Sequence, residues 1–163
     1  SHVAAAGEDK KTKKHLAKLL TLVTYLIRFH SLANRFKHTP ETLKNEMGIP
    51  LPLGVHMLQV FAEGSDTSYT KPQLVKDRLL LVLAVTSLMA CNFDLEIDDL
   101  ALDIKMHADK LCNYFKEVGA KLNKTTKKVK TENGGAITMH TYRTTLNVPL
   151  TFPKKSRGPA GSR

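Results

Sequence analysis

The spacing of apolar residues predicts three helices in the first part of the chain. The helical period holds over residues 15–36 and indicates one long amphipathic helix or two closely joined ones. Thr39 and Pro40 are typical of a helix start, since threonine caps a helix and proline fits its first position. A short helix is therefore expected over 40–47, and a third helix over 53–63.

The same succession begins again after a polar, turn-rich stretch at residues 64–72, which is either a short wing or a linker. A strongly apolar helix is expected over 73–91, and a short extended link follows at 92–97, where apolar and acidic residues alternate. Two further helices are expected over 98–104 and 108–122, joined by a turn. The second part thus repeats the helical order of the first.

Beyond residue 122 the pattern changes from helical to strand-like. Residues 127–130 and 137–148 are rich in threonine, valine, isoleucine and tyrosine, which favour strands. The sequence Asn-Gly-Gly at 133–135 stands between them and suits a hairpin turn that needs positive φ. A β-hairpin is therefore expected after the last helix.

The order in the second part is helix, extended link, helix, turn, helix and hairpin, which is the order of a winged helix. The first part repeats the helices and has only a reduced wing. The predicted fold is therefore mostly α with small β-hairpin wings, a tandem winged helix built from two helix-turn-helix units. We expect the first winged helix over residues 10–70 and the second over 71–153, with flexible ends at 1–9 and 154–163.

Positive charge is concentrated near the end of the chain. The 163 residues carry a formal net charge of +10. Residues 1–70 have a net charge of +3, residues 71–115 of −2 and residues 116–163 of +9. A positive field on one segment attracts polyanions, so nucleic acid is the leading candidate partner and an anionic membrane the second. A surface that only improves solubility is the alternative.

The lysines of the last helix and of the hairpin are candidate phosphate contacts. In a winged helix the third helix can enter a groove of DNA, and the hairpin can lie against phosphates. Lysine predominates over arginine here, which favours binding with little sequence preference, because bidentate readout of guanine usually uses arginine. The candidate DNA-binding residues are Lys110, Lys116 and Lys121 in the helix, Lys124, Lys127, Lys128, Lys130 and Arg143 in the hairpin, and Lys154 and Lys155 in the tail.

The third helix expected in the first winged helix has a different character. Residues 53–63 contain no lysine or arginine. A fold does not fix a function, and winged helices also serve as protein-interaction modules. The alternative function is therefore a module that docks on a protein partner without direct DNA binding.

The sequence contains no motif for catalysis, a cofactor or a metal. Its seven histidines are scattered, and none pairs with another metal ligand at a usual spacing. The acidic residues between positions 94 and 103 lack the glycine and the final glutamate of a calcium loop, and stabilisation of a helix start explains them better. No apolar run approaches the roughly 18 residues of a membrane span. The polar faces of the helices are not conspicuously basic, which argues against binding at a membrane surface as well. We expect a non-enzyme without metal or cofactor and without a membrane partner.

Five segments of the second part form a distinctive set: DRLL at 77–80, NFDL at 92–95, LALDIKM at 100–106, FKEVGAKL at 115–122 and TLNVPLTFP at 145–153. Together they resemble one known family, the forty-nine-kilodalton-class subunit of RNA polymerase I, in its C-terminal tandem winged-helix region. The resemblance covers roughly residues 10–157 and is strongest over 77–153.

This resemblance implies a region that binds double- or single-stranded DNA and has no catalytic residues of its own. It implies support of initiation and elongation of ribosomal RNA transcription, in the nucleus and its nucleolus. The implied protein partners are the RNA polymerase I core and a partner subunit, through regions outside this chain, with an initiation factor as a further expected partner. The implied DNA surface is the third helix and wing of the second copy, where the candidate lysines stand.

Overall fold

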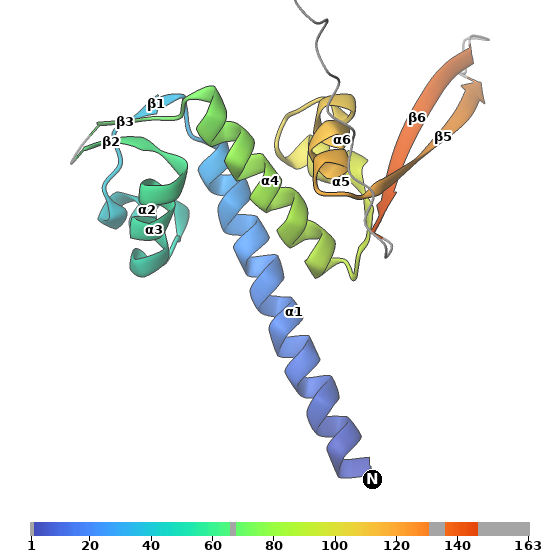
Figure 1. Ribbon diagram of the computed structural model, residues 1–163, viewed down its shortest axis with the longest axis horizontal. Coiled ribbons are helices and arrows are strands. Elements are labelled where there is room, and N and C mark those ends of the chain that lie inside the picture. Colours follow the sequence, from blue (N-terminus) through green and yellow to red (C-terminus); the bar gives the residue numbers. More distant parts are fainter. Residues whose placement is uncertain (1, 66–67, 131–135, 147–163) are drawn as a thin grey trace, which may run out of the picture.

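The computed structural model describes residues 2–65, 68–130 and 136–146, and one order of elements occurs in it twice (Figure 1). The order is helix, strand, helix, helix and two strands, and it confirms the predicted tandem winged helix. The first copy consists of α1 (His2–Ser31), β1 (Arg35–Phe36), α2 (Pro40–Met47), α3 (Leu51–Phe61), β2 (Glu63–Ser65) and β3 (Ser68–Thr70). The second consists of α4 (Gln73–Ala90), β4 (Asp94–Glu96), α5 (Ile97–Asp103), α6 (Ala108–Glu117), β5 (Lys121–Lys130) and β6 (Ala136–Thr145).

Each copy has a three-stranded antiparallel sheet with the same topology. The strand orders are β1-β3-β2 and β4-β6-β5, so in both sheets the strand after the first helix pairs with the last strand. The wings differ in length, because β2 and β3 have three residues each while β5 and β6 have ten each. The polar stretch at 64–72 is therefore a short wing, not a linker.

The bounds of α1 correct two expectations at the start of the chain. The helix begins at His2, so residues 2–9 are helical where a flexible lead-in was expected. Three consecutive alanines stand at residues 4–6, and alanine is the residue that favours helix most. The helix ends at Ser31, and Phe36 lies in β1, where its buried ring contacts those of Phe29 and Tyr69 at centroid distances of 5.9 and 5.7 Å. Phe36 fits the helical spacing of apolar residues by chance, because it is buried in a strand and is apolar for that reason.

The local signals for α2 are confirmed, while α3 begins earlier than expected. The backbone N–H of Thr42 donates to the side-chain oxygen of Thr39 at 3.3 Å, which caps α2. Gly48 ends α2 with a left-handed φ of 68°. The next helix begins at Leu51 and includes Pro52 in its first turn, where the missing N–H of proline is not needed.

The last helix is shorter than the sequence pattern indicates. A helix was expected over 108–122, but α6 ends at Glu117. Gly119 follows with a φ of 88°, a conformation that breaks the helix, and β5 begins at Lys121. Lys121 is therefore a strand residue and does not belong to the third helix.

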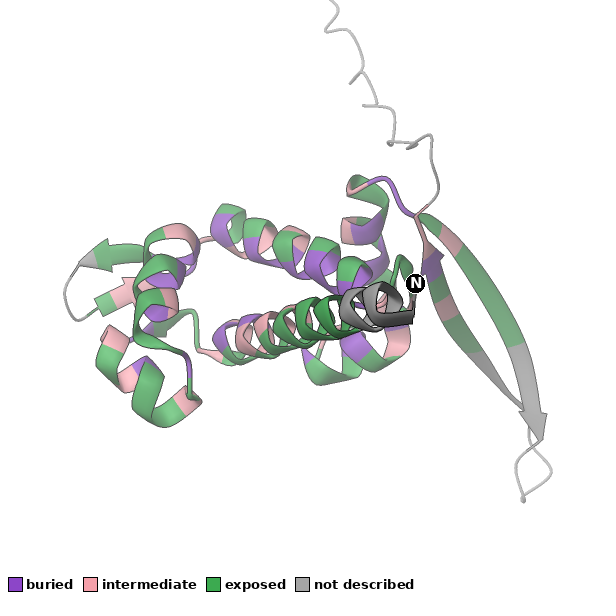
Figure 2. Ribbon diagram, turned by 90° about the horizontal axis from the view of Figure 1, so that it is seen from below, coloured by how far each residue is buried: buried purple, intermediate pink, exposed green. Residues whose placement is uncertain are grey.

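The two winged helices share one core. A single connected cluster of buried side chains contains Phe29 of the first copy and Phe115 of the second, each 0% exposed. Helices α1 and α4 pack side by side, and Figure 2 shows buried residues where these helices face each other. The first half of α1 extends beyond this core, and residues 10–18 are exposed (Figure 1). The two copies are thus joined by packing as well as by the chain.

Lys71 is a buried cation at the junction between the copies, 4% exposed. Its ammonium donates to the carbonyl oxygens of Phe29, His30 and Leu32 at 3.2, 2.9 and 2.6 Å. The ammonium also lies 5.8 and 5.9 Å from the ring centroids of Phe29 and Phe36. The last carbonyls of a helix have no partner within the helix, so Lys71 caps the end of α1.

Replacing Lys71 with methionine is expected to destabilise the fold by about 1–3 kcal/mol. Methionine fills similar space, but it leaves carbonyls at the end of α1 without a donor, which costs roughly this amount. Urea unfolding followed by circular dichroism measures the change in the free energy of unfolding. The control is Lys44→Met at an exposed position of α2, and equal stability of the two variants would contradict the capping role.

Candidate nucleic-acid interface

The β5–β6 hairpin is the most cationic element of the described chain. Its two strands contain no aspartate or glutamate. The hairpin extends away from the helices at one side of the molecule (Figure 1). Two strands with positive charge and no carboxylate suit the phosphates of a nucleic acid; the one acidic residue of the hairpin sequence, Glu132, stands between the strands. The lysines of β5 are Lys121, Lys124, Lys127, Lys128 and Lys130.

The base of this hairpin is fixed to the helices through Tyr142. Its backbone N–H donates to a carboxylate oxygen of Asp98 at 2.7 Å, and its hydroxyl donates to Asp109 in the first turn of α6. The hydrogen bond to Asp109 raises the pKa of Tyr142. Lys124 stands opposite Tyr142 in the strand register, and its ammonium lies 5.4 Å from the centre of the ring. The helices therefore hold the hairpin, and with it Lys124, in a defined position.

Arg143 has a carboxylate partner within the chain. Its Nε and one terminal nitrogen donate to the two oxygens of Asp94 at 2.7 and 2.6 Å, a bidentate ion pair between β6 and β4. The hydrogen bond from Arg143 also lowers the pKa of Asp94. Arg143 was expected to contact phosphate, and the ion pair engages its Nε and one of its two terminal nitrogens. In the structure it fastens the hairpin to the extended link.

Helix α6 contributes less positive charge than the sequence analysis expected. Of the three lysines expected in this helix, Lys110 and Lys116 belong to α6, whereas Lys121 is the first residue of β5. Lys110 and Lys116 are exposed, but so are Asp109 and Glu117, so these four charges cancel. The excess of positive charge in the second winged helix therefore lies on the hairpin.

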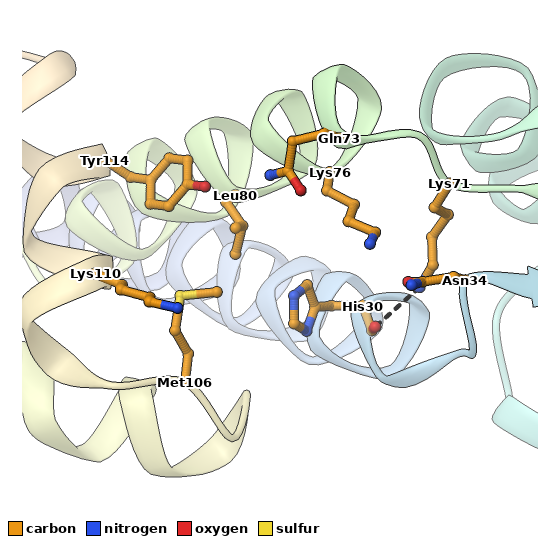
Figure 3. A pocket seen from close by; sticks show the side chains of 9 residues that line it. All are labelled: His30, Asn34, Lys71, Gln73, Lys76, Leu80, Met106, Lys110 and Tyr114. Atoms are coloured by element: carbon orange, nitrogen blue, oxygen red, sulfur yellow. Dashed lines mark hydrogen bonds between the residues drawn. The ribbon is translucent and has the colours of Figure 1, made fainter.

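Lys110 lines a cavity of about 350 Å³ between the two winged helices (Figure 3). Three further basic side chains line the same cavity: His30 near the end of α1, Lys71 before α4, and Lys76 in the first turns of α4. This cluster could not be predicted from the sequence, because its members lie up to 80 positions apart and only the packing of α1, α4 and α6 brings them together.

Burial and the neighbouring positive charges lower the pKa values of two basic groups in the cavity. Burial lowers the pKa of His30, and the nearby charges of Lys71 and Lys76 lower it further. Burial, followed by the charge of Lys76, lowers the pKa of Lys71 to about 8. The cavity therefore concentrates positive charge that bulk water does not fully screen.

The remaining predicted contacts are only partly covered by the structure. Lys154 and Lys155 lie outside the described residues, as does the expected hairpin turn at 133–135. For three lysines of β5 the structure gives the strand register, which pairs Lys127 with Met139, Lys128 with Thr138 and Lys130 with Ala136.

The described residues contain neither a cluster of metal ligands nor a helix that could span a membrane. No group of three or more histidine, cysteine, aspartate or glutamate side chains is placed there to hold a metal ion. Of the helices within residues 2–65, 68–130 and 136–146, none combines the length and the apolar character needed to cross a membrane.

The chain is similar to one family of known proteins. The sequence profile of one family, described as A49-like RNA polymerase I associated factor, matches residues 1–153. Among curated proteins, none matches the chain. The matched range includes both winged helices and every described element.

Proposed function

This chain belongs to the family of A49-like RNA polymerase I associated factors, and from that premise we propose that its second winged helix binds the DNA backbone during transcription. Membership of the family gives the chain a role in RNA polymerase I transcription, in association with that polymerase. It also places the chain in the nucleus. The contact with DNA, its site and its consequences are the proposal.

The observation that carries the proposal is the charge of the β5–β6 hairpin. Five lysines and no carboxylate occupy its two strands, and hydrogen bonds from Tyr142 to Asp98 and Asp109 fix its base. A lysine ammonium acts on phosphate as a point charge and does not select a base pair. The proposed binding therefore has little sequence preference and applies to double- or single-stranded DNA.

The proposed role follows from holding DNA at the polymerase. A backbone contact that tolerates any sequence suits a factor that supports both initiation and elongation on ribosomal RNA genes, in the nucleolus. We propose that the chain does this without catalysis, that an initiation factor is a further partner, and that a partner subunit binds through regions outside this chain.

Binding of the isolated chain to duplex DNA is expected to weaken steeply with salt. Each phosphate neutralised contributes about −0.9 to the slope of log affinity against log salt, so the lysines of β5 predict a slope of about −3 to −5. Fluorescence anisotropy on two unrelated duplexes of equal length, over a salt series, measures the slope and the sequence preference. Absence of binding at 50 mM salt, or a strong preference for one duplex, would contradict the proposal.

The first winged helix supports a second candidate function, docking on a protein. Its third helix, α3, has no lysine or arginine and exposes Leu51 and Val55, which are 40% and 38% exposed. An uncharged surface with exposed apolar side chains suits a protein partner better than a phosphate backbone. If the chain binds RNA polymerase I but not DNA at low salt, docking is its function and DNA binding is not.

A further inference from the structure

The cavity between the winged helices adjoins the cationic hairpin. Tyr142 of β6 donates its hydroxyl hydrogen bond to Asp109, and the next residue of α6, Lys110, lines the cavity. Lys124 lies over the ring of the same tyrosine. The first turn of α6 therefore separates two cationic surfaces, the hairpin and the cavity, that lie next to each other.

We propose that this cavity binds one phosphate group of the DNA whose backbone the hairpin contacts. The proposal rests on the proposed function and extends it, because it adds a contact made partly by the first winged helix. It assigns a role to His30 of α1 and Lys76 of α4, which lie outside the interface expected from the sequence.

Donors for a phosphate reach the cavity from several directions. Lys76 comes from α4, Lys110 from α6 and the ring of His30 from α1, and Figure 3 shows these side chains around the hollow. In the described part of the chain, neither lysine forms an ion pair with a carboxylate. The amides of Asn34 and Gln73 also line the cavity. A tetrahedral oxyanion can accept hydrogen bonds from several such directions at once.

Lys71 contributes charge to the site but has no free donor. All three hydrogens of its ammonium can be assigned to the carbonyls at the end of α1. Its position is therefore fixed before any ligand arrives. Leu80 and Met106 supply an apolar part of the wall, which limits the screening of the charges by water.

One carboxylate, that of Asp77, opposes these cations at the edge of the cavity. Its Oδ1 accepts hydrogen bonds from the amide of Gln73 and the hydroxyl of Tyr114, both at 2.7 Å, and both donors line the cavity. Burial, together with the bond to Asp77, raises the pKa of Tyr114 to about 12, so its hydroxyl adds no negative charge at neutral pH. Three lysines against one carboxylate leave the site positive.

The direct test follows the ring of His30 by NMR while inorganic phosphate or a short duplex is added. Without a ligand, burial and the charges of Lys71 and Lys76 lower the pKa of His30. The other charged and titratable groups around the cavity are Lys110, Tyr114 and, at its edge, Asp77. A bound anion offsets the lysines, so the pKa of His30 is expected to rise toward its ordinary value with either ligand. No change with either would overturn the proposal.

The variant Lys76→Gln separates the cavity from the hairpin. It is expected to abolish the response of His30 to phosphate and to make the salt slope of DNA binding shallower by about one, which corresponds to roughly a tenfold loss of affinity at 0.1 M salt. The matched control, Lys44→Gln, removes the same charge from an exposed position of α2. It should change neither the response of His30 to phosphate nor the salt slope of DNA binding. Circular dichroism and unfolding curves establish that both variants fold.

The outcomes distinguish this proposal from the proposed function. DNA binding that is unaffected by Lys76→Gln but lost in hairpin variants would overturn the phosphate site and leave the proposed function standing. A response of His30 to phosphate, with no DNA binding by the wild-type chain, would overturn the assignment to DNA. In that case the cavity would be a site for an acidic or phosphorylated protein segment.

Discussion

Replacing Lys127, Lys128 and Lys130 together with glutamine is expected to weaken DNA binding by about two to three orders of magnitude at 0.1 M salt. Each phosphate contact that is lost removes about 0.9 from the salt slope and, at this salt concentration, close to one power of ten in affinity. The three lysines lie in the outer half of β5, in a strand without carboxylates. The salt series described above measures both the slope and the affinity.

The control for this triple variant carries the same change in net charge elsewhere. Lys18, Lys37 and Lys44 are exposed residues of the first winged helix, and their replacement with glutamine also removes three positive charges. If the lysines of the hairpin contact phosphates directly, only the hairpin variant loses affinity for DNA. Equal losses in the two variants would mean that net charge attracts DNA and that the hairpin is not the site.

The fold could be predicted from the sequence wherever local chemistry decides the structure. Thr39 and Gly48 mark the ends of α2 by their capping properties, which need no tertiary contact. Prediction failed where tertiary packing decides instead. Strand β1 has two residues, too few for a periodic signal, and exists because Phe36 pairs with Tyr69 across the sheet.

The candidate site, too, could be predicted from the sequence only in part. The charge of the hairpin could be read from its composition, because its lysines are close together in the sequence. The ion pair between Arg143 and Asp94 could not, since it depends on the register that places β6 beside β4. The cavity with His30 and Lys76 depends on the packing of three helices from two copies. A single sequence does not show which residues, far apart in the chain, become neighbours in the fold.

Leu83→Ala is expected to lower the free energy of unfolding by about 2–5 kcal/mol and to destabilise both winged helices together. Leu83 lies in the middle of α4 and is 0% exposed. Truncating a buried leucine loses its transfer free energy and leaves a cavity, which together cost this amount. A loss of that size is a large fraction of the stability of an ordinary domain.

The loss should spread to both copies because α4 packs against α1 as well as against α6, and the buried side chains of both copies form one cluster. Hydrogen exchange, measured peptide by peptide, should therefore show reduced protection in α2 and α3 as well as in α5 and α6. The control is Val82→Ala on the same helix, where the side chain is 37% exposed and the expected loss is smaller. Reduced protection confined to α4, α5 and α6 would show that the copies unfold independently. In that case His30 would keep its place in the first copy while Lys76 and Lys110 lose theirs, so the phosphate site would depend on the stability of the second copy alone.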